Sequence, residues 1–114
     1  MTAEDLETYL ASLGYKVETV TAPNQEEYTV IRDVTVSGGT YVGRQCDVAL
    51  LRCTSDPYAL PAAIHTRPTL ASKGTLNIQD SNLGADWAYW SRRLDRPPTP
   101  KAILTHILTV LSEV

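Results

Sequence analysis

The stretch Tyr41–Pro68 constrains the fold more than any other part of the sequence. Both the odd and the even positions of the run 44–53 carry apolar side chains, which predicts a strand that contributes to both faces of a sheet. Pro57 and Pro61 then bar regular ladder pairing, because each lacks an N–H donor and has a fixed φ. A second, short strand is expected over 62–66. The sequence therefore predicts two strands joined by a rigid, proline-bounded turn.

Upstream of this stretch, the sequence predicts one helix and two further strands. Thr2 begins an approximate capping box for an amphipathic helix over 3–13. Alternation and turn residues predict strands over 15–21 and 28–36. In the second strand, four apolar residues share one face that is interrupted by Arg32: Tyr28, Val30, Val34 and Val36. Short turns between neighbouring strands favour an antiparallel meander of four strands.

Downstream, apolar residues at helical spacing predict two helices. Trp87 and Trp90 recur with flanking leucines at this spacing, which predicts a short helix over 84–94 with both tryptophans on one face. Thr99 and Pro100 form a good N-cap and first-turn pair for a final helix. Its apolar stripe consists of Ile103, Ile107, Val110, Leu111 and Val114. We expect an α+β fold, with an antiparallel sheet of about four strands, an N-terminal helix and a C-terminal helix pair.

Composition limits the class of protein. The 114 residues allow one domain, spanning 1–114, and the 43% hydrophobic and 20% charged residues are ordinary for a globular chain. The net charge of −3, with mixed signs, argues against broad nucleic-acid binding. No apolar run reaches the length of a membrane span, and the N-terminus is acidic rather than signal-like. We expect a soluble, cytoplasmic protein with neither a nucleic-acid nor a membrane partner.

The two cysteines show neither a disulfide pattern nor a metal-binding pattern. Cys46 and Cys53 lie seven residues apart on one predicted strand, so they face opposite sides and cannot bridge each other within it. With no C-x-x-C and only two histidines, the sequence predicts no metal site and no cofactor. We interpret both thiols as small, buried hydrophobic groups.

Two groups of residues in the second part of the chain resemble a known family. The first is a glycine-containing turn, a strand and a proline flap, formed by Gly39, Tyr41, Gly43, Pro57, Tyr58 and Pro61. The second combines aromatic residues, arginines and prolines: Trp87, Tyr89, Trp90, Ser91, Arg92, Arg93, Arg96, Pro97 and Pro98. Together they resemble the ubiquitin-conjugating-enzyme (UBC) fold, and the second is similar to the Trp-Ser-Arg-His signature of its bacterial branch called prokaryotic family E. In the flap, Pro and Tyr stand in the reverse of the family's usual order.

The resemblance implies a place in a ubiquitin-like modification pathway, with a ubiquitin-like protein and an activating-enzyme-like protein as partners. Members of the family use a cysteine thioester, since a thiolate is a good nucleophile near neutral pH. The position that matches the family's catalytic cysteine, counted back from Pro97 and Pro98, falls within 86–89, and this range contains no cysteine. Arg67, Pro68 and Thr69 stand where the family has His-Pro-Asn. Both departures argue against thioester chemistry.

Ser91 is the remaining candidate catalytic residue. Arg92 and Arg93 beside it could stabilise an oxyanion, and the preceding loop could bring Asp80 or Asp86 near. Arg93 stands where the family has a histidine, and this chain's only two histidines are distant in sequence. In the alternative interpretation, Ser91 hydrogen-bonds to local backbone and the arginines pair with acidic neighbours.

Four residues around this serine are candidate binding residues: Tyr89, Trp90, Arg92 and Arg93. Aromatic residues and arginines are typical anchors of protein interfaces. Core packing explains the tryptophans equally well. Tyr89 and Arg93, four apart on the predicted helix, are better candidates for exposure.

The sequence leaves three functions open, and with them the question of whether the chain is an enzyme. The first is a UBC-like component of a bacterial ubiquitin-like modification pathway that lacks the usual cysteine and binds and positions its two partners. The second is an unusual transferase that forms an oxyester through Ser91. The third is a plain protein-interaction adaptor, since a fold alone does not establish catalysis.

Overall fold

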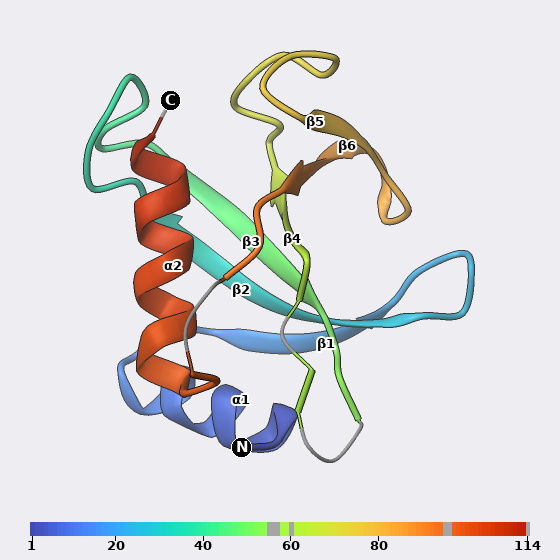
Figure 1. Cartoon of the computed structure of the whole chain (residues 1–114), viewed down its shortest axis with the longest axis vertical. Coiled ribbons are helices and arrows are strands. Elements are labelled where there is room, and N and C mark those ends of the chain that lie inside the picture. Colours follow the sequence, from blue (N-terminus) through green and yellow to red (C-terminus); the bar gives the residue numbers. More distant parts are fainter. Residues whose placement is uncertain (55–57, 60, 95–96, 114) are drawn as a thin grey trace.

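The computed structural model describes residues 1–54, 58–59, 61–94 and 97–113. This part of the chain forms one antiparallel sheet of six strands in the order β1-β2-β3-β4-β6-β5. Figure 1 shows α2 lying across the sheet, with α1 close to one end of it. In chain order, the elements are α1 (Ala3–Ser12), β1 (Val17–Thr21), β2 (Glu27–Thr35), β3 (Gln45–Leu51), β4 (Ala63–Arg67), β5 (Ile78–Ser81), β6 (Gly84–Ser91) and α2 (Pro100–Ser112).

The α+β class and the two terminal helices are confirmed, whereas the sheet has six strands rather than about four. The first four strands form the predicted meander, in which each strand pairs with the next. The two additional strands, β5 and β6, extend the sheet beyond β4. Only one helix, α2, follows the sheet in the described residues, so the predicted C-terminal helix pair is wrong. None of the helices described is long and apolar enough to cross a membrane.

The helix α1 begins as its sequence predicts. The Thr2 hydroxyl accepts a hydrogen bond from the Asp5 N–H at 3.1 Å, and the Asp5 carboxylate accepts one from the Thr2 N–H at 2.9 Å. This reciprocal pair satisfies two of the donors that a helix N-terminus leaves unpaired. Leu6 and Leu10 are buried against the sheet and α2, which anchors this short helix.

A β-bulge divides β2 into two parts, and the alternation of side chains between the two faces of the sheet is reversed from one part to the other. The pairing of β2 with β3 shifts between Ile31 and Val34, and Asp33 adopts a positive φ of 55° there. Val34 therefore lies in the core beneath the helices, whereas Tyr28 and Val30 lie on the other face of the sheet. The prediction of one shared face is confirmed for Tyr28 and Val30. It is wrong for Val34 and Val36, because the bulge changes the parity of the strand.

The segment predicted as a helix over 84–94 is instead the strand β6 with a short continuation. Its tryptophans are three residues apart, so in a strand they face opposite sides. Trp90 is fully buried in the core beneath the helices, and its Nε1–H donates to the Thr66 hydroxyl at 2.9 Å. Trp87 packs on the other face. Two neighbouring strands pair with β6, and this ladder outweighs the helical spacing of the apolar residues.

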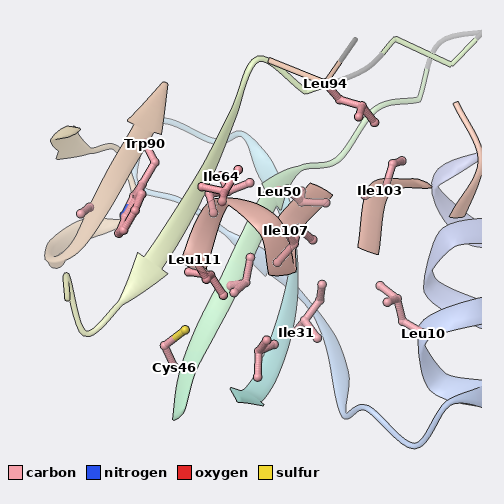
Figure 2. Packing of buried hydrophobic residues seen from close by; sticks show 14 of the residues in the cluster. Leu10, Ile31, Cys46, Leu50, Ile64, Trp90, Leu94, Ile103, Ile107 and Leu111 are labelled. Carbon is pink, nitrogen blue, oxygen red and sulfur yellow. The ribbon is translucent and has the colours of Figure 1, made fainter. Parts of the chain in front are cut away.

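The main core lies between the helices and one face of the sheet. Figure 2 shows Ile103, Ile107 and Leu111 of α2 among Leu50, Ile31 and Ile64 of the sheet. The N-cap is the predicted one, since the Thr99 hydroxyl accepts from the Ala102 N–H at 3.2 Å. The buried residues of α2 are the predicted stripe apart from Val114, which lies outside the described residues.

Truncating the centre of this stripe should lower the free energy of unfolding substantially. Ile107 and Leu111 are both 0% exposed, so Ile107→Ala and Leu111→Ala should each cost about 2–5 kcal/mol. Thr105→Ala, at an exposed position of the same helix, is the control and should cost less than about 0.5 kcal/mol. Equilibrium denaturation measures all three. Equal, small costs at the buried and exposed positions would contradict this packing.

Candidate functional site

Both helices pack on one face of the sheet, and the opposite face, called the open face here, carries the candidate site. A second, smaller cluster of buried apolar residues lies on this face: Ala22, Tyr28, Val30, Ala49 and Trp87. Two rows of polar side chains cross the strands beside it. The first row is ionic and the second is built around a buried histidine.

The ionic row runs from β1 to β6. The Asp47 carboxylate accepts hydrogen bonds from Arg32 and from Arg67, both at 2.9 Å. Arg32 also binds Glu18 at 2.9 Å, and the Arg67 guanidinium lies 4.7 Å from the centre of a Trp87 ring. Each cation of this row has a partner, so the row ties five strands together rather than presenting a free charge.

The same contacts tune the carboxyl group at the centre of the row. Burial would raise the pKa of Asp47, but hydrogen bonds from Arg67, from the backbone N–H of Asp33 and from Arg32 outweigh it and hold the pKa below its usual value. Asp47 is therefore ionised at neutral pH. It acts as an anchor of the sheet rather than as a proton donor.

The second row is centred on His65 of β4. Its ring lies edge-to-face between Tyr28, at a centroid distance of 5.1 Å, and Tyr89, at 5.3 Å. His65 is only 4% exposed, and its Nδ1 lies 2.8 Å from the Ser81 hydroxyl oxygen. Burial lowers the pKa of His65 to about 4, so the imidazole is neutral at pH 7.

A cavity of about 340 Å³ opens beside this histidine. It lies between the second polar row and the segment that follows β3. Its apolar wall consists of Leu51, Cys53, Ala59, Pro61, Ala62 and Ala63. The polar part of the wall consists of Glu26, Tyr28, Arg52, His65, Asn82 and Tyr89. A concave, mainly apolar wall with a few polar groups is the usual form of a small-ligand site.

Ser91 ends β6 and is exposed, opposite Ala63 of β4. Its N–H donates to the Asn77 carbonyl oxygen at 3.1 Å, and its own carbonyl oxygen accepts from an Arg92 nitrogen at 2.9 Å. Within the described part of the chain, the Ser91 hydroxyl has no hydrogen-bond partner. The predicted local contacts of Ser91 are therefore made by its backbone.

The groups predicted to activate Ser91 are engaged elsewhere. His65 is paired with Ser81, and His106 Nε2 lies 3.2 Å from the Arg92 carbonyl oxygen. Asp80 does line a recess of about 300 Å³ together with Ser91, but it pairs with Lys73 at 3.2 Å. Asp86 is exposed and does not line that recess. Of the two aspartates expected near Ser91, Asp80 thus lies beside it. Neither histidine is placed to act as its base.

The four predicted binding residues have different environments. Arg93 is exposed, Tyr89 is half-buried and Arg92 lies 3.5 Å from the Glu113 carboxylate. Trp90 is 0% exposed and belongs to the core, so it offers no surface to a partner. Arg93 is therefore exposed as predicted, but it follows the end of β6 instead of lying on a helix, whereas Tyr89 is only partly exposed on that strand.

The proline flap is described only in part, because Pro57 lies outside the described residues. Tyr58 is buried in the core beneath the helices, and burial raises its pKa to about 12. Pro61 is half-buried and lines the cavity beside His65. The flap tyrosine thus acts as a packing residue, and the following proline shapes the cavity wall.

The two cysteines differ in their positions. Cys46 is 3% exposed, and burial raises the pKa of its thiol to about 11, which makes it a buried hydrophobic group as predicted. Cys53 lies beyond the end of β3 at Leu51, so the prediction that both share one strand is wrong. Cys53 is half-buried, and its Sγ accepts from the Ala59 N–H at 3.2 Å. No group of three metal-binding side chains is found in the described ranges.

The open face therefore offers two neighbouring candidate sites, the cavity beside His65 and the recess beside Ser91. Tyr89 and Asn82 line both. In the sequence, His65 is only one of two histidines distant from Ser91, because its partners come from three other segments of the chain. Comparison of the chain with models of protein families, with curated protein sequences and with solved structures found no match.

The buried histidine predicts a pH-dependent stability. His65 titrates at about 4 in the folded protein and near 6.5 when unfolded, so the unfolded chain binds more protons between these values. The free energy of unfolding therefore has its full value above pH 6.5. It decreases by at most about 3 kcal/mol as the pH is lowered toward 4. Urea denaturation between pH 7 and 4.5 measures it. The variant His65→Phe should show a flatter pH dependence, and identical slopes would contradict the assignment.

Proposed function

We propose that this chain is a UBC-like component of a bacterial ubiquitin-like modification pathway. In this role it binds and positions a ubiquitin-like protein and an activating-enzyme-like protein without forming a covalent intermediate. Two kinds of observation support the proposal. The first concerns the order of elements in the fold, and the second concerns the surroundings of Ser91.

The order of elements agrees with what the resemblance implies. An N-terminal helix is followed by a four-stranded antiparallel meander, and a C-terminal helix packs on the same face of the sheet as the first (Figure 1). The chain departs from that pattern after β4, where it forms the β5–β6 hairpin. This hairpin carries the Trp-Ser-Arg segment on an inner strand. The segment is thus held rigidly, which suits a binding surface.

The observation that carries the non-covalent form of the proposal is the isolation of the Ser91 hydroxyl. A serine nucleophile needs a base within hydrogen-bond reach, since its own hydroxyl is a weak nucleophile at neutral pH. His65 and His106 both have other partners, and the nearby Asp80 is paired with Lys73. Among the described residues, Ser91 thus has neither a thiol's reactivity nor an activating neighbour.

The exposed side chains around Ser91 form the binding surface in this proposal. Arg93 is exposed. Tyr89 is half-buried and lines the recess beside Ser91. A tyrosine with a fixed ring and an arginine are typical energetic anchors of protein interfaces. Tyr89 is held edge-to-face against His65, so it loses little conformational freedom on binding.

A reconstitution experiment tests whether Ser91 carries an adduct. The protein is incubated with its cognate activating-enzyme-like protein, ATP and the ubiquitin-like protein, and intact mass is measured. We expect no increase by the mass of one ubiquitin-like protein, in the wild type or in Cys53→Ala. An adduct that forms on the wild type and disappears in Ser91→Ala would instead establish the transferase.

Binding to the ubiquitin-like protein is tested on the same surface by calorimetry. Arg93→Glu and Tyr89→Ala should each weaken binding about tenfold or more, as truncation of an interface anchor does. Arg44→Glu is the charge-matched control at another exposed arginine and should leave the affinity unchanged. Ser91→Ala should also bind as the wild type does. If the wild type binds neither partner, the plain adaptor becomes the better description.

A further inference from the structure

The cavity beside His65 has the dimensions of a small-molecule site. Its volume of about 340 Å³ exceeds the share of about ten liquid water molecules, each near 30 Å³. Alanine and proline side chains form much of its wall: Ala59, Pro61, Ala62 and Ala63. These short or rigid groups cannot extend to fill the space. The cavity therefore has room for a ring with a short substituent.

The contacts of Ser81 allow the His65 tautomer that carries its hydrogen on Nε2. The Ser81 oxygen accepts from the Leu83 N–H at 3.1 Å and lies 2.8 Å from His65 Nδ1. The Ser81 hydroxyl can donate its hydrogen to Nδ1 while its oxygen accepts from the Leu83 N–H. The neutral imidazole then carries its hydrogen on Nε2. This N–H has no protein partner among the described residues and is not sealed from solvent.

Two aromatic contacts hold that N–H in place. The rings of Tyr28 and Tyr89 lie against His65 at interplanar angles of 76° and 82°. The imidazole is therefore held from both sides before a ligand arrives, which limits the entropy lost on binding.

Of the charged side chains at the described wall, Arg52 is paired with a carboxylate, whereas Glu26 has only a neutral amide partner. Arg52 binds the Glu7 carboxylate through two nitrogens, at 3.1 and 3.3 Å. Glu26 accepts a hydrogen bond from the Asn24 amide at 2.6 Å. The remaining polar groups at the wall, including His65, are uncharged at neutral pH. An anionic ligand would lose its hydration here without gaining a free cation among the described residues of the wall, which is costly.

We infer that this cavity binds a small molecule without negative charge that combines an apolar ring with a carbonyl or amide oxygen. The ring packs against the alanine and proline wall, and the oxygen accepts the hydrogen bond from His65 Nε2–H. The site shares Tyr89 and Asn82 with the recess beside Ser91, but the inference does not depend on the proposed function. It adds a ligand to a domain for which only protein partners are otherwise expected.

Three probes of equal ring size test the ligand class. Benzamide has the ring and a neutral acceptor, benzoate replaces the acceptor by a charge, and toluene has no acceptor. Titrations followed by ¹H–¹⁵N NMR should show benzamide binding at least tenfold more tightly than benzoate or toluene. Shifts should centre on β4 and on the segment after β3. Equal affinities for benzamide and benzoate, or no binding of benzamide, would overturn the inference.

Two substitutions locate the probe. Ala62 is exposed and lines the cavity, so Ala62→Trp should fill the space and abolish benzamide binding without disturbing the core. Ala11→Trp, at an exposed position on α1, is the matched control and should bind as the wild type does. Retention of binding in Ala62→Trp would contradict this location.

The second substitution tests the hydrogen bond. His65→Phe keeps an aromatic ring but removes Nε2–H, so the affinity for benzamide should fall to that for toluene. Unchanged benzamide affinity in a folded His65→Phe protein would refute the donor role. Arg93→Glu and Ser91→Ala should leave benzamide binding intact, which separates this test from that of the proposed function.

Discussion

The pairing of β4 with β6 is the interaction on which both the core and the candidate sites depend. Its register places Ile64 opposite Trp90 and His65 opposite Tyr89. The first pair faces the helices and fills the core, whereas the second faces the open side and forms one wall of the cavity. Because side chains alternate along a strand, a single register sets both sides of the sheet at once. Stability and the candidate sites are therefore coupled in this ladder.

Elements governed by local signals could be predicted from the sequence. The capping pair at Thr2 and the N-cap at Thr99 identify the helices, because these contacts form within a few residues. The β5–β6 hairpin could not be predicted in the same way. Its tryptophans satisfy helical spacing as well as strand alternation on two faces, and only the ladder with β4 decides between them. The bulge at Asp33 is likewise stabilised from another strand, by the Asp47 carboxylate.

The candidate sites were predictable to a similar, limited extent. Sequence proximity correctly placed Tyr89, Ser91 and Arg93 in one short segment, and the structure presents them at or near the surface. The histidine cluster combines residues of β2, β4, β5 and β6, so no local pattern identifies it. Burial of Trp90 also follows from strand parity rather than from residue type. What a side chain can do in this chain depends on which face of the sheet it occupies.

The ionic row across the open face has a consequence for how the chain avoids misfolding. Glu18, Arg32, Asp47 and Arg67 alternate in sign from one strand to the next. If one of these strands slid by a single residue, its charged group would move beneath the helices and leave its partner unpaired. Competing alignments of the meander are thus penalised electrostatically as well as by lost apolar contact. The row and the apolar pattern together therefore favour one arrangement of strands over its competitors.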